Sequence, residues 1–184
     1  MEKNFSDRWL AKMANTDPNS GSTPKTVANT VKHSGLVDEE IWPHEGIKTL
    51  EEFYKEIPED IKEKGLEFLK DYEFGYEYVA QDKIKEALKR SPVSVAVYAW
   101  AQNDKGEYIR LGPSGHYVVL VAYDEQDRPI IFDSYESGIK TLEKNYNLEF
   151  PQIYVLKKKE EKPKESFWQK LLEAIKKYLN EFLN

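Results

Sequence analysis

The stretch SGHYVVLVAYDEQDRPIIFDSYES, residues 114–137, carries the strongest local signal for the fold. Two apolar runs, residues 117–123 and 130–132, flank the polar segment DEQDRP, which is rich in turn-forming residues. This arrangement predicts a β-hairpin, in which the start of the first strand lies beside the end of the second. We therefore expect His116 and Asp133 to lie opposite each other at the open end of this hairpin.

A pairing of His116 with Asp133 would matter for chemistry, because a carboxylate beside an imidazole fixes the tautomer and the orientation of the ring. A general base requires both. The structural alternative is a partly buried histidine whose ring binds a backbone carbonyl. The glycine before His116 and the expected carboxylate partner favour the active-site interpretation.

The composition is that of a globular domain. The 184 residues are 33% charged and 40% hydrophobic, with 12 Tyr and 4 Trp, which is enough to form one core. The net charge of −6 argues against a nucleic-acid partner, because no basic stripe is present to displace counterions from phosphates. No apolar run reaches the length of a membrane span, and the first residues lack a signal-peptide core, so we expect a soluble protein of unknown compartment.

The chain has no cysteine, which excludes disulfides, thiolate metal sites and a cysteine nucleophile within these residues. Its histidines, His33, His44 and His116, lack the spacing of metal ligands, and we assign no role to His33 or His44. We therefore expect neither a metal nor another cofactor.

Helix signals dominate the first half of the chain. The predicted helices are residues 5–13, 24–34, 49–56 and 58–70, and the expected N-caps of the first three are Ser6, Thr23 and Thr49. The segment after the second helix is irregular, with Ile41 and Trp42 as its expected anchors.

Strand signals dominate the second half. Residues 72–80 are expected to be extended and to lead into a short helix capped by Asp82. The predicted strands that follow are residues 93–101, 106–111, 117–123, 130–132 and 151–156. Because helices come first and antiparallel strands later, the predicted fold class is α+β.

The end of the chain is predicted to lie outside this domain, which would span residues 1–156. Residues 157–165, KKKEEKPKE, are interpreted as a charged linker, and residues 166–184 as a C-terminal amphipathic helix. Such a helix can dock onto its own chain, self-associate or bind a partner helix. Its mixed charges make a membrane surface the weakest of these options.

Four segments resemble, in their order, the papain-like cysteine peptidases, and more closely the divergent papain-like domains of bacteria and bacterial viruses. They are FSDRWLAKMA (5–14), NSGSTPKTVANTVKHSGLVDEEIWPHEG (19–46), SPVSVAVYA (91–99), and GHYVVLVAYD (115–124) with IIFDSYES (130–137). Each motif is weak alone, and their order over residues 5–156 gives the resemblance its specificity. It implies a helical half, here truncated, packed on an antiparallel β half with a cleft between them.

The resemblance also implies roles for individual residues. His116 would be the general base, and Asp133 would stand in place of the asparagine that orients it. Tyr135 occupies the position of a tryptophan that shields this pair, so looser shielding is expected. The residues implied to bind a peptide substrate are Ser20, Gly21 and Ser22 in the glycine-containing loop, and Val95 and Tyr117 in the main specificity pocket.

The main departure from the family is the nucleophile. The family's cysteine and oxyanion-hole glutamine precede the segment that begins here at Phe5, and neither residue stands before it in this chain. Ser6 is a poor replacement, because Trp9 is too far from it and the loop at residues 19–23 follows too early. One interpretation is a portion of a cysteine peptidase, inactive alone, whose nucleophile lies on a missing N-terminal segment or a separate chain. The other interpretation is a non-catalytic module derived from a peptidase, which binds a partner through the former substrate cleft or through the C-terminal helix.

Overall fold

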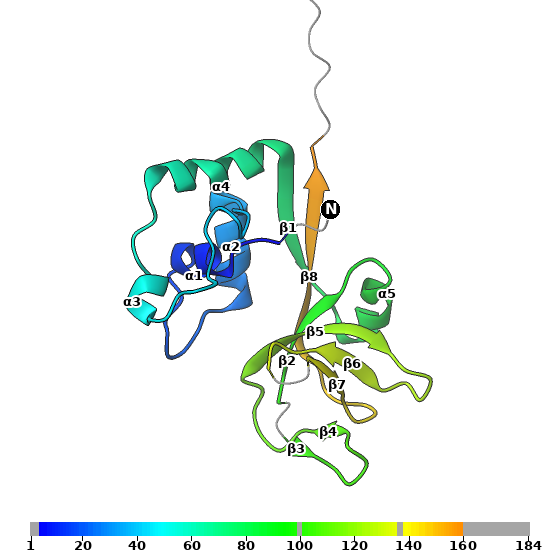
Figure 1. Ribbon diagram of the computed structural model, residues 1–184. Helices are drawn as coiled ribbons and strands as arrows, with labels where there is room; N and C mark the ends of the chain where they lie inside the picture. Colours follow the sequence, from blue (N-terminus) through cyan, green and yellow to red (C-terminus); the bar gives the residue numbers. More distant parts are fainter. Residues whose placement is uncertain (1–3, 99–100, 136–137, 160–184) are drawn as a thin grey trace, which may run out of the picture.

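The computed structural model describes residues 4–98, 101–135 and 138–159, and it confirms the α+β class, with helices first and an antiparallel sheet after them (Figure 1). The helical half contains α1 (Asp7–Met13), α2 (Pro24–Ser34), α3 (Leu50–Phe53) and α4 (Glu59–Asp71). The β half contains β1 (Tyr72–Tyr78), the 3-10 turn η1 (Gln81–Lys83), α5 (Ile84–Leu88), β2 (Val93–Val97), β3 (Ala101–Gln102), β4 (Tyr108–Ile109), β5 (His116–Tyr123), β6 (Pro129–Phe132), β7 (Ile139–Thr141) and β8 (Glu149–Lys158).

The expected C-terminal helix, residues 166–184, lies outside the described residues, as does most of the expected linker. Strand β8 continues to Lys158, past the predicted domain boundary at residue 156. Among the described residues, no helix is both long and apolar enough to cross a membrane.

Side-chain caps determine where the first three helices begin. The hydroxyls of Ser6, Thr23 and Thr49 each accept a hydrogen bond from the backbone N–H three residues further on, as predicted. Helix α2 ends at Gly35, whose φ of +70° favours glycine. A Cβ at Gly35 would lie 1.8 Å from the carbonyl oxygen of Gly65, so α2 and α4 approach each other through a pair of glycines.

Three predictions about the helices and the segment that follows α2 were wrong, and the predicted strand 106–111 is shorter, since β4 spans only Tyr108–Ile109. Helix α3 ends at Phe53 and not at residue 56, because it buries no residue that would stabilise a further turn. Asp82 lies inside η1 and caps neither η1 nor α5. Ile41 is 40% exposed, whereas Trp42 is 7% exposed, so Trp42 is the anchor of the pair.

Among the described residues, six strands form one sheet in the order β1-β8-β2-β5-β6-β7, and each neighbouring pair is antiparallel. Strand β8 pairs with β1 over most of its length and with β2 near its start. Strands β3 and β4 form a separate hairpin. The short strand β7 was not predicted from the sequence.

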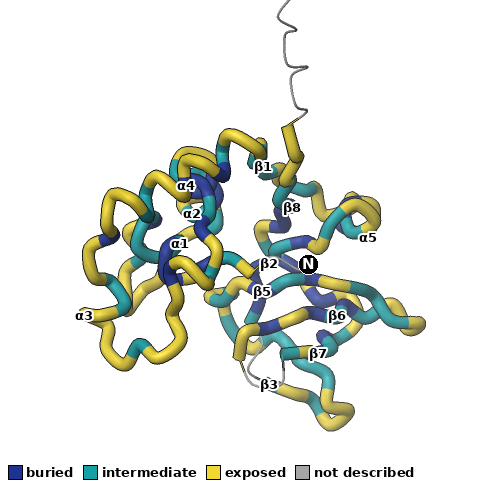
Figure 2. Tube along the Cα trace, turned by 45° about the horizontal axis from the view of Figure 1, so that its top comes forward, coloured by how far each residue is buried: buried dark blue, intermediate teal, exposed yellow. Residues whose placement is uncertain are grey.

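One face of this sheet is the core of the β half. Strand alternation places Val93, Val95 and Val97 of β2 on the same face as Val118 and Leu120 of β5, and all are buried. Helix α5 covers this face. Within the β half, Figure 2 shows the buried segments concentrated in the central strands, with exposed turns around them.

Candidate functional site

Three neighbouring strands bring a histidine, a carboxylate and a lysine to one end of the core face. His116 begins β5 and shares the face of Val118. Asp133 follows β6, two positions after the buried Ile131, and therefore lies on the same face. Lys140 of β7 is the register partner of Ile131. His116 and Asp133 thus lie close together, as predicted, and Lys140 lies beside them as a third residue of the site.

The side chains of these residues are joined through both carboxylate oxygens of Asp133. Nε2 of His116 lies 2.7 Å from Oδ1, and Nζ of Lys140 lies 2.7 Å from Oδ2. The backbone N–H of Tyr135 donates a further hydrogen bond to Oδ1 at 3.0 Å. The side chains of His116, Asp133 and Lys140 are 13%, 1% and 2% exposed, so the carboxylate is enclosed and its imidazole partner reaches the surface.

Asp133 is ionised at neutral pH. Burial acts to raise its pKa, but the hydrogen bonds from Lys140, His116 and the Tyr135 amide outweigh burial and lower the pKa below the ordinary value. An ionised carboxylate can only accept hydrogen bonds, so the pattern assigns the proton of the neutral imidazole to Nε2. Acid–base chemistry by His116 would then take place at Nδ1.

An aromatic ring covers the imidazole. The ring of Tyr135 stacks on His116 with a centroid distance of 4.5 Å and an interplanar angle of 8°. Tyr135 is 53% exposed, so it shields one side of the imidazole without sealing it from solvent. The stacking limits rotation of the imidazole about its hydrogen bond to Asp133.

The hairpin of β3 and β4 covers the lysine. Nζ of Lys140 lies 4.9 Å from the ring centroid of Tyr108, and the carbonyl of Tyr108 accepts a hydrogen bond from the Glu143 amide at 2.9 Å. These contacts keep the ammonium group against Asp133 and away from water.

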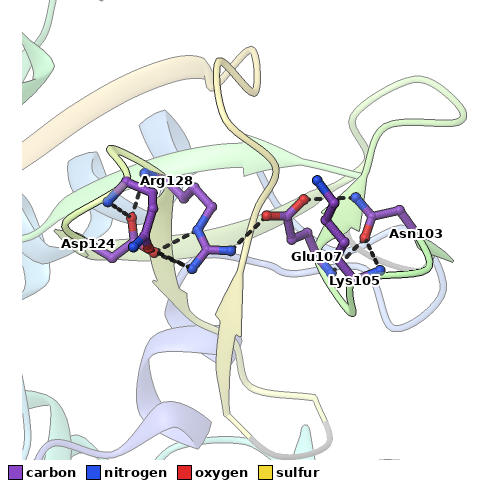
Figure 3. A network of polar contacts seen from close by, with 6 residues as sticks. Asn103, Lys105, Glu107, Asp124 and Arg128 are labelled. Carbon is purple, nitrogen blue, oxygen red and sulfur yellow. Dashed lines mark hydrogen bonds and ion pairs between the residues drawn. The ribbon is translucent and has the colours of Figure 1, made fainter.

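A polar network ties this hairpin to the turn between β5 and β6 (Figure 3). Arg128 donates to Asp124 and to Glu107, each at 2.7 Å, and Asn103 donates to Glu107 at 2.8 Å. The hydrogen bond from Arg128 is the main reason that the pKa of Glu107 is lowered. The network therefore helps to hold the strand that carries Tyr108 beside Lys140.

The predicted peptide-binding loop is exposed and internally bonded. Oδ1 of Asp17 accepts from the amides of Asn19 and Ser20 at 2.9 and 2.7 Å and from the hydroxyl of Ser20 at 2.9 Å. Gly21 has a φ of +76°, a conformation that favours glycine. Ser20 and Gly21 are exposed and Ser22 is half-buried. The amide of Gly21 donates to the Asp17 carbonyl at 2.8 Å and the Gly21 carbonyl accepts from the Asp17 amide at 3.3 Å, so much of the loop's backbone is bonded within the loop.

Tyr117 lines a hollow between the two halves with a volume of about 250 Å³. The other lining residues are Thr23, Pro24 and Lys25 at the start of α2, and Tyr78, Phe150 and Gln152 on the sheet. The hollow therefore begins directly after the loop that ends at Ser22.

Val95 lies apart from this hollow. Its side chain is 0% exposed and packs in the core, because alternation places it on the face opposite to that of Tyr117. The structure thus brings Tyr117 close to the predicted loop and keeps Val95 away from both.

Lys140 was missed by sequence reasoning. It stands in a three-residue strand, IKT, whose pattern gives no sign that a lysine is buried there. Among the residues that the structure describes, no group of three or more metal-ligating side chains lies close enough to hold a metal ion.

Comparison with models of known protein families gives no match, and no curated protein matches the sequence. Function is therefore inferred from the geometry of the site and from the order of the sequence motifs.

Proposed function

We propose that this chain is the histidine-bearing portion of a papain-like cysteine peptidase, with the nucleophilic thiolate supplied from outside these residues. The observation that supports this most is the hydrogen bond between His116 and Asp133 beneath the ring of Tyr135. A base, a polar side chain that orients it and an aromatic shield are three features that the resemblance implies for these positions, and here Asp133 stands in place of the orienting asparagine.

The chemistry would be nucleophilic acyl transfer. Nδ1 of His116 takes the proton of a cysteine thiol, and the thiolate attacks the peptide carbonyl. His116 then gives that proton to the leaving amine, and water hydrolyses the acyl-enzyme with His116 again acting as the base. Asp133 holds the ring in position throughout and stabilises the imidazolium.

The substrate would be an extended peptide. Backbone groups of the loop at residues 20–22 that are not bonded to Asp17 can hydrogen-bond a peptide main chain, and the hollow beside Tyr117 can receive one of its side chains. The hollow is lined by Tyr78, Tyr117 and Phe150, which suits an apolar or aromatic side chain.

A binding module without catalysis is the second candidate. The observation in its favour is that the chain contains no cysteine while the hollow is formed by its own residues. Such a module would bind a peptide at the loop and the hollow and leave it intact.

The source DNA upstream of this sequence distinguishes the two functions. For the peptidase, we expect the reading frame to continue into a segment with a glutamine and a cysteine, and the chain extended by that segment should cleave a fluorogenic peptide. His116→Ala in the extended chain should then lower kcat by about 10²–10⁴-fold. His33→Ala is the matched control and should leave kcat unchanged.

The isolated 184-residue chain should show no turnover. Turnover that His116→Ala abolishes in the isolated chain would contradict an external nucleophile. A stop codon and a ribosome-binding site directly upstream would instead favour the binding module.

A further inference from the structure

A buried ammonium group contacts Asp133 on the oxygen that His116 does not use. Oδ1 accepts from the imidazole and Oδ2 from Nζ of Lys140, each at 2.7 Å. The resemblance implies a neutral asparagine at position 133, and this chain carries a carboxylate there. The negative charge of Asp133, directly after β6, therefore lies beside the positive charge of Lys140 on the neighbouring strand β7.

We propose that Lys140 compensates the charge of Asp133, so that His116 has as its partner the electrostatic equivalent of a neutral amide. Lys140 is in this sense a positioning residue: it acts on the base through Asp133 and touches no substrate. The inference rests on the proposed function only where it identifies His116 as the base.

The direction of the effect follows from the charges. An ionised carboxylate alone beside an imidazole favours the imidazolium form. The ammonium group on the opposite oxygen repels a second positive charge and reduces that preference. Because the side chains of Asp133 and Lys140 are 1% and 2% exposed, solvent and salt screen this opposition weakly.

Stability alone does not account for the pair. Enclosing an ammonium and a carboxylate costs desolvation free energy that their attraction only partly repays, and apolar replacements of such pairs are often neutral or stabilising. In the part of the chain that the structure describes, Tyr135 stacks on His116 and Tyr108 of β4 lies against Lys140, so both tyrosines are further titratable groups beside the pair.

The test is an NMR titration of the histidine rings in the full chain, for the wild type, Lys140→Met, Asp133→Asn and the double variant. Lys140→Met leaves the carboxylate uncompensated and should raise the titration midpoint of His116 by about one pH unit. Asp133→Asn leaves the ammonium uncompensated and should lower the midpoint. The double variant removes both charges and should return the midpoint to within about 0.3 units of the wild type.

The rings of His33 and His44 are internal controls. Both are exposed, neither contacts the pair, and their midpoints should stay constant in all four proteins. An unchanged or lowered His116 midpoint in Lys140→Met would overturn the proposal. So would a double variant that keeps the shift of either single variant.

The single variants each leave a buried charge without its partner, so unfolding of one of them is a foreseeable result. The double variant has no such charge and can be compared with the wild type even if a single variant unfolds. A His116 midpoint in the double variant that differs from the wild type by about one unit or more contradicts charge compensation. The titration needs no peptidase activity. A result that contradicts charge compensation by Lys140 is therefore distinguishable from one that contradicts the proposed function, which the extended chain tests separately.

Discussion

In the β half, aliphatic side chains from β2, β5, β6, β8 and α5 form one continuous core, whereas the buried cluster of the helical half consists of Trp9, Val37, Trp42 and Ile57. The two halves also differ in the burial and the hydrogen-bond partners of an arginine. Arg8 is 3% exposed and donates to the carbonyls of Phe53, Pro43 and Glu52. Arg128 lies at the periphery and donates to carboxylates.

The difference shows how a small core can hold long loops. The helical half has few aliphatic residues to bury, so polar side chains bind the backbone of its loops and of the short helix α3 directly. Arg8 is the clearest case, and Nε1 of Trp9 likewise donates to the Gly35 carbonyl at 3.2 Å. In the β half the ladders satisfy the backbone, and polar networks only connect the edges.

The largest expected effect comes from Trp9→Ala. The indole is fully buried and packs against Gly65, so its removal leaves a cavity that the short helices cannot fill. We expect a loss of about 3–5 kcal/mol, confined mainly to the helical half. Hydrogen exchange measured residue by residue would show amides of α1, α2 and α4 losing protection while those of β2 and β5 keep theirs.

Leu120→Ala is the matched control in the other core. It should cost about 2–5 kcal/mol and reduce protection in β2, β5 and β6 first. An equal loss of protection in both halves, for either variant, would mean that the two cores unfold as one cooperative unit.

A smaller effect is expected for Arg8→Met. Methionine keeps much of the apolar stem and removes the donors, so that partly buried carbonyls lose their partners at a cost of about 1–3 kcal/mol. Urea unfolding followed by tryptophan fluorescence measures this loss. Arg8→Lys should recover only part of it, because one ammonium group cannot reach all three carbonyls. Full recovery with lysine would show that charge, and not the fork of donors, is what matters.

The smallest effect is expected for Arg128→Gln. The partners of Arg128 are Glu107 and Asp124, at the periphery of the β half, where ion pairs contribute little. The melting temperature should fall less than in Arg8→Met, and about 1 M NaCl should remove most of the difference from the wild type. A larger fall in melting temperature than for Arg8→Met, or a fall that salt does not change, would show that the Arg128 network contributes substantially to the stability of the β half.

The features predicted correctly from the sequence are those set by neighbours along the chain. The caps Ser6, Thr23 and Thr49 act on the backbone three residues away, and the hairpin that joins His116 to Asp133 depends on one short turn. Local rules suffice in both cases.

The features that were missed depend on which strands become neighbours. Lys140 is buried because β7 pairs with β6 and because the β3–β4 hairpin lies over the lysine. Neither contact can be predicted from the sequence IKT. Val95 was assigned to a pocket by the family resemblance, and strand periodicity could not correct this, because it shows that two faces exist but not which of them is the core. Arg8 is buried where it donates to carbonyls of the short helix α3, more than forty residues away.

The place of β8 at the end of the described chain has a consequence for synthesis on the ribosome. Helices α2 and α4 contact the sheet mainly through β1, and in the sheet β1 pairs with β8. Until residues 149–158 are made, β1 has no strand to pair with, and one edge of β2 stays open to other chains. A stop codon within β8 would therefore release a polypeptide whose two halves lack their common strand.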